Sequence, residues 1–129
     1  MDFATLTLGR KPNRFLMAPA GLCQQAQPHA ESPVFKVPAA VLMQHLLDLV
    51  RSEDRVSIKE VSENSLRAKF VARSRIFRFP DVIDVQILPL DDATSTLAVF
   101  ARARYGVRDF GVNRARIEDW IARLRSRVG

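Results

Sequence analysis

The alternation of apolar and polar side chains between residues 55 and 105 constrains the fold more than any other feature of this chain. Four runs in this stretch place apolar residues at every second position, which is the period of a strand with one buried face. Turn-forming residues separate the runs at 63–65 and 91–94. Because short turns join antiparallel neighbours, we expect a four-stranded antiparallel sheet. The predicted strands are residues 55–61, 66–77, 82–90 and 95–105.

A one-sided helix is expected before these strands and another after them. The first begins at Val37 and Pro38, since proline suits the first turn of a helix, and ends near residues 52–54. The second runs from Asn113, the expected N-cap, to Arg127. Both helices can cover only one face of a sheet, which predicts a two-layer α+β sandwich in the order helix, four strands, helix. The expected buried stripes are Ala39, Leu42, Met43, Leu46, Leu49 and Val50, and Ile117, Trp120, Ile121 and Leu124.

The first 33 residues are interrupted by Pro12, Pro19, Pro28 and Pro33, and proline breaks regular structure. Apolar residues between the prolines can still hold this segment onto a core. We therefore expect an irregular packed arm at residues 1–33, with a disordered tip at 1–7, followed by a single α+β domain at 34–129.

Composition limits the classes of function. The net charge is +6 and most of the basic residues are arginine, which permits an anionic partner without requiring one. The lone Cys23 cannot form an internal disulfide and is interpreted as an inert or structural thiol. His29 and His45 have no metal-ligand or catalytic spacing, so neither a metal nor a cofactor is expected. With neither a membrane-spanning run nor a signal peptide, the sequence as written predicts a cytoplasmic protein.

The arginine-rich stretch from Ala101 to Arg116 is the candidate functional site. It reads as the end of a strand, a glycine-containing loop and the start of the last helix. Its arginines could fasten these elements to acidic partners such as Asp81 or Asp84, and this architectural interpretation is favoured. They could also bind a phosphate, carboxylate or acidic peptide at the helix N-terminus. The candidate ligand-binding residues are Arg102, Arg104, Arg108, Asp109, Asn113 and Arg114.

The same stretch resembles a known family. Residues 79–81 (Phe-Pro-Asp), 102–106 (Arg-x-Arg-Tyr-Gly) and 109–116 (Asp-Phe-Gly-Val-Asn-Arg-x-Arg) are similar to the signature of the bacterial and plastid-associated domain-of-unknown-function family 1499. The resemblance extends from about Pro12 to Leu124 and implies no established activity. It does imply that some relatives carry an anchor or export signal. Ala101 and Ala103 replace serines that are usual in the family, which weakens any serine-based chemistry.

Three functions follow as hypotheses. The leading one is a non-enzymatic binding domain with an anion site at the arginine-rich stretch. The second is an enzyme acting on a small anionic substrate, with Asp109 or Asp84 as the acid/base. The third, nucleic-acid binding by a basic sheet face, is least favoured because the sequence has no recognised nucleic-acid motif. That face would comprise Arg67, Lys69, Arg73, Arg75, Arg102 and Arg104, with Phe77 and Phe100 as stacking platforms.

Overall fold

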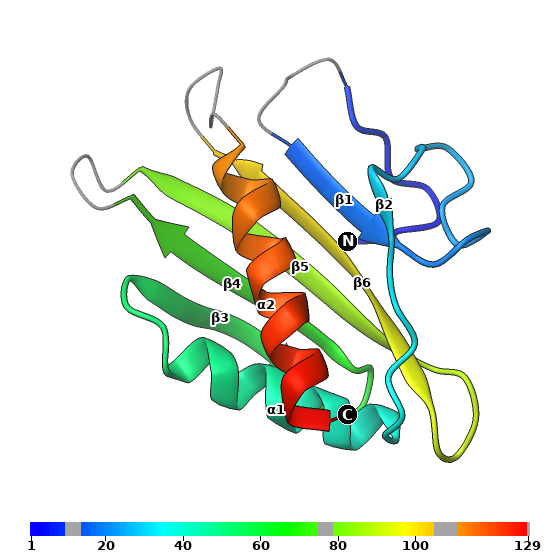
Figure 1. Cartoon of the computed structure of the whole chain (residues 1–129). Coiled ribbons are helices and arrows are strands. Elements are labelled where there is room, and N and C mark those ends of the chain that lie inside the picture. The colour runs from blue at the N-terminus through cyan, green and yellow to red at the C-terminus, as the bar shows by residue number, and fades with distance from the viewer. Residues whose placement is uncertain (10–13, 75–78, 105–110, 129) are drawn as a thin grey trace.

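A six-stranded mixed sheet with two helices on one face forms the body of the protein (Figure 1). The computed structural model describes residues 1–9, 14–74, 79–104 and 111–128. The strand order across the sheet is β2-β1-β6-β5-β4-β3. The elements in chain order are β1 (Arg14–Ala18), β2 (Ala30–Glu31), α1 (Ala39–Arg51), β3 (Val56–Ser62), β4 (Arg67–Arg73), β5 (Pro80–Pro89), β6 (Ser95–Ala103) and α2 (Val112–Val128).

Strands β3 to β6 lie side by side in sequence order, and each pairs antiparallel with the next, as the alternation predicts. Asp91 closes the turn between β5 and β6, because its Oδ1 accepts hydrogen bonds from the backbone N–H groups of Ala93 at 2.8 Å and Thr94 at 2.7 Å. Ala68, Phe70 and Ala72 of β4 are all buried, which places the predicted apolar face of this strand in the core.

The prediction of four strands, all antiparallel and all after the first helix, is wrong. β1 pairs antiparallel with β6, and β2 pairs parallel with β1, so two strands precede α1 and extend the sheet. The short run Phe15–Ala18 is buried on both faces of the sheet and therefore shows no alternation. Such a run gives no period-2 signal, and the neighbouring prolines suggested irregular structure instead. The domain boundary after residue 33 stays a prediction.

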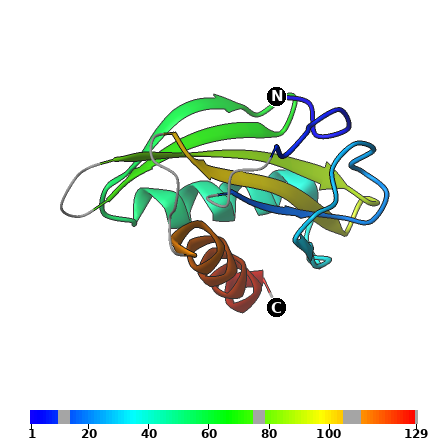
Figure 2. The same ribbon diagram turned by 90° about the horizontal axis from the view of Figure 1, so that it is seen from above.

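The main core lies between the sheet and the two helices, which cover the same face (Figure 2). Every residue of the predicted helical stripes is buried, because each recurs on the side of its helix that faces the sheet. Phe70 of β4 and Trp120 of α2 meet edge to face, with ring centroids 6.1 Å apart. The buried side chains of α1 therefore share one core with six residues of β5 and β6, which are Ile83, Val85, Ile87, Leu97, Val99 and Ala101.

A second, smaller core covers part of the opposite face, which makes the domain more than two layers thick over β1 and β6. Phe3 of the N-terminal segment is 2% exposed and packs with Leu16, Ala18, Ala98 and Phe100. The segment lies on the side of the sheet away from the helices (Figure 2). The burial of Phe3 contradicts the expected disordered tip at residues 1–7. The part of this face that the N-terminal segment does not cover is open to solvent.

Candidate functional site

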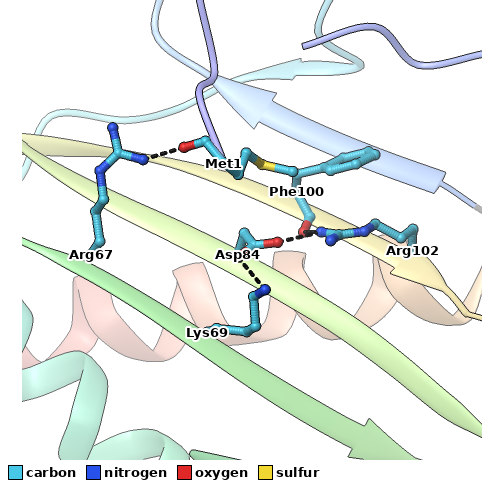
Figure 3. Close-up of polar contacts among 6 residues, drawn as sticks. All are labelled: Met1, Arg67, Lys69, Asp84, Phe100 and Arg102. Atoms are coloured by element: carbon cyan, nitrogen blue, oxygen red, sulfur yellow. Dashed lines mark hydrogen bonds and ion pairs between the residues drawn. The ribbon is translucent and has the colours of Figure 1, made fainter. Parts of the chain in front are cut away.

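Arg102 holds a carboxylate on the face of the sheet opposite the helices, here called the helix-free face. Its Nη1 donates to Asp84 Oδ2 at 2.6 Å, and Lys69 Nζ lies 4.0 Å from the other carboxylate oxygen (Figure 3). The Arg102 guanidinium also sits over the Phe100 ring, 4.9 Å from its centroid. The Asp84 side chain is only 11% exposed. These contacts tie β4, β5 and β6 together across the sheet.

A second ion pair occupies the other face, between the sheet and α2. Arg116 Nη1 lies 3.2 Å from Asp81 Oδ2 and 2.9 Å from Asn113 Oδ1, to which it donates. Asn113 is fully buried and is the second residue of α2, which starts at Val112, so it stands two positions after the N-cap position. Its side chain therefore helps to hold Arg116 against the beginning of β5, which is an architectural role.

Arg114 is an exposed candidate residue at the start of α2. Its Nε donates to Glu118 Oε1 at 2.6 Å, one turn further along α2, and its side chain is 56% exposed. The guanidinium also lies over the Phe15 ring at 5.3 Å. Because Phe15 belongs to the helix-side core, Arg114 approaches the sheet from the same side as the helices.

The six candidate residues do not form one cluster. Arg102 contacts the helix-free face, whereas Arg114 and Asn113 are on the side of the helices. Arg104 follows the end of β6, where its backbone N–H donates to the carbonyl of Pro80 at 3.0 Å. Arg108 and Asp109 lie outside the described residues. The sheet therefore separates Arg102 from Arg114, and one small ligand would not contact both.

The sequence predicted both acidic acceptors, Asp81 and Asp84, but not the arginine that binds Asp81. Asp81 and Asp84 are three residues apart on one strand, so their side chains point to opposite faces. This odd spacing is a signal that the two carboxylates serve different arginines. A second arginine is therefore expected on the other side of the sheet. This residue is Arg116, which binds Asp81 and is missing from the candidate set.

Other side chains that could carry chemistry are poorly placed for it. Burial raises the pKa of the Cys23 thiol above its ordinary 9.0, which disfavours the nucleophilic thiolate. His29 Nδ1 accepts a hydrogen bond from the backbone N–H of Leu16 at 2.9 Å, so this ring nitrogen is engaged in structure. Within the described ranges, no group of three His, Cys, Asp or Glu side chains could hold a metal ion.

Two further findings concern membrane spanning and nucleic-acid binding. Neither α1 nor α2, the helices found in the described part of the chain, is both long and apolar enough to cross a membrane. Phe100, proposed as a stacking platform, is 2% exposed and lies under the N-terminal segment, so it cannot stack on a base. Arg75 and Phe77 of the same proposed strip lie outside the described residues.

The comparisons with known proteins agree with the motif. No curated protein matches this chain. A family model described as "Protein of unknown function (DUF1499)" matches residues 6–124. The match includes the strands that hold Asp81, Asp84 and Arg102, and the first turns of α2. Because it covers most of the sequence, the chain belongs to the DUF1499 family of proteins of unknown function.

Proposed function

We propose that this protein is a non-enzymatic binding module that takes an anionic group at the N-terminal end of α2. The observation that carries the proposal is the charge of this helix end. Its first turn contains Arg114 and no acidic residue. The helix dipole makes this end positive, so it favours an anion and disfavours a cation. An arginine placed there has a physical reason if a negatively charged ligand completes the site.

The neighbouring charges support the same proposal. Arg116 is compensated by Asp81 in a mostly buried contact. Among the described residues, the acidic partner of Arg114 is Glu118, and both side chains are more than half exposed, so the pair contributes little to stability. The remaining guanidinium nitrogens of Arg114 can bind a phosphate or carboxylate in the planar, two-pronged manner typical of arginine. Arg104, Arg108 and Asp109 precede this helix end in the sequence and stay candidates for the same site, whereas Arg102 lies on the other face of the sheet and Asn113 accepts a hydrogen bond from Arg116.

The alternative functions have less support. An acid/base role for Asp84 conflicts with its contact to Arg102 at 2.6 Å, because a carboxylate engaged by a guanidinium is not free to approach a substrate. Asp109, the other proposed acid/base residue, lies outside the described residues. Nucleic-acid binding loses the stacking surface that Phe100 was expected to supply.

Calorimetric titration at low ionic strength with inorganic phosphate, succinate and an acidic peptide tests this proposal. We expect saturable binding of at least one of these anions, weakened about tenfold by R114Q, since charge-assisted hydrogen bonds contribute about 1.5–3 kcal/mol. R104Q should weaken binding too. R125Q is the matched control, because Arg125 is an exposed arginine in the last turn of the same helix. Binding that is absent, or equally changed by R125Q, would refute the proposal.

A further inference from the structure

A cavity of about 210 Å³ opens on the helix-free face, between the N-terminal segment and strands β3, β4 and β5. It is smaller than the roughly 300–1,000 Å³ of sites for drug-sized molecules, so its size suits a small ion or the terminal group of a larger ligand. Its polar lining comes from Glu60, Ser62, Ser65, Arg67, Lys69 and Asp84.

Arg67 is the cation in this cavity for which the described part of the chain supplies no acidic partner. Its Nη1 donates to the backbone carbonyl of Met1, a neutral acceptor that fixes the orientation of the guanidinium (Figure 3). No carboxylate among the described residues forms an ion pair with it. A neutral carbonyl leaves the charge uncompensated, and the other guanidinium donors remain for a ligand.

Lys69 adds a second positive group on the same face of β4, two residues further along the strand. Its only carboxylate contact among the described residues is with Asp84, at 4.0 Å, which is too long for a hydrogen bond. Asp84 is held much more closely by Arg102, at 2.6 Å. The Lys69 side chain is 37% exposed, so its ammonium group can donate to an additional acceptor.

A hydroxyl group completes the set of donors. Ser62 Oγ accepts hydrogen bonds from Ser65 Oγ at 2.7 Å and from the Ser65 backbone N–H at 3.4 Å. Because this oxygen is the acceptor in both contacts, its own proton is left for donation. Ser62 lies opposite Arg67 in the β3–β4 register, so the hydroxyl and the guanidinium line the same end of the cavity.

We propose that this cavity is a second binding site, for the phosphate or carboxylate group of a small anion, held by Arg67, Lys69 and the Ser62 hydroxyl. Two carboxylates also line the cavity: Glu60 is exposed to solvent, and Asp84 is held by Arg102 at 2.6 Å. The site is independent of the one at the start of α2, because Arg67 lies on the helix-free face and Arg114 lies on the helix side of the sheet.

The test is an NMR titration of the full chain with inorganic phosphate, and in parallel with acetate, at constant ionic strength. We expect saturable shifts of the amides of Ser62, Ser65, Arg67 and Lys69. R67Q should weaken binding about tenfold and K69Q less. E60Q should tighten it by about twofold to fivefold, because one opposing exposed charge is removed. Stronger binding of one probe would identify the group as phosphate or carboxylate.

Two controls separate this site from other effects. R51Q removes an exposed arginine of α1, a helix that covers the opposite face, and should change nothing. R114Q should leave these shifts intact, so the two proposed sites fail or survive separately. Shifts that do not saturate, or that are the same in R67Q and E60Q as in the unaltered protein, would overturn the inference.

Discussion

At the scale of single residues, the direction of each side chain decides the role of each arginine. Arg102 and Phe100 share one face of β6, and Asp84 reaches the same face from β5. Asp81 faces the other way and meets Arg116 instead. The sequence predicted an arginine network with Asp81 or Asp84 as acceptors, and both are indeed acceptors. It could not show that the sheet divides the network, because the arginines come from separate elements whose packing is set by tertiary contacts.

The ion pair between Arg102 and Asp84 should contribute more to stability than an exposed pair. We expect D84N to be strongly destabilising, because it leaves a mostly buried guanidinium without its carboxylate. A double-mutant cycle with R102Q should give a coupling energy of about 1–2 kcal/mol by urea unfolding. The same cycle on the exposed pair Arg114 and Glu118 serves as the reference and should give about 0.3–0.5 kcal/mol. Equal coupling energies for the two pairs would contradict this account.

Asp91 should titrate below the ordinary aspartate pKa of 3.8. The backbone N–H of Ala93 is the main cause, with help from Thr94, because both stabilise the carboxylate form. A lowered folded-state pKa means that the contribution of Asp91 to stability is complete above its unfolded pKa. That contribution is lost as the pH falls through the lower folded value. NMR titration of the carboxyl carbon checks this, and a midpoint at or above 3.8 would show that the turn does not bind the carboxylate.

At the scale of elements, the strands and helices with a clear period could be predicted and those without one could not. The alternation of β4 and the stripe of α1 lie where the sequence placed them. β1 was missed because its short run is buried on both sides, and β2 because two residues carry no period. The packing of the N-terminal segment was missed too, since only a tertiary contact buries Phe3.

The N-terminal segment should stabilise the fold through Phe3. We expect F3A to reduce the free energy of unfolding by ~3 kcal/mol, because a fully buried aromatic ring is lost from the second core. V34A is the matched control: Val34 is 58% exposed, so its truncation should stay within about 0.5 kcal/mol. Chemical denaturation of both variants provides the comparison. A loss for F3A as small as that for V34A would mean that the segment does not pack on the sheet in solution.

At the scale of the whole molecule, the two faces of the sheet differ in what covers them. One face is covered by both helices, while the other is partly covered by the N-terminal segment and partly open, with Arg67 and Lys69 beside the cavity. Some arginine side chains join elements through acidic partners, and we propose that others bind anions. Composition indicated the excess of arginine, but only the fold shows how it is divided.

The most direct test of the proposed function is the amide NMR spectrum of the full chain as inorganic phosphate is added at constant ionic strength. We predict saturable shifts at Val112, Asn113 and Arg114, the first turn of α2, because an anion bound there would lie at the positive end of the helix dipole. These shifts should need about tenfold more phosphate in R114Q and be unchanged in R125Q. A first turn whose amides do not move, or move without saturation, would contradict the claim that this helix end binds an anion.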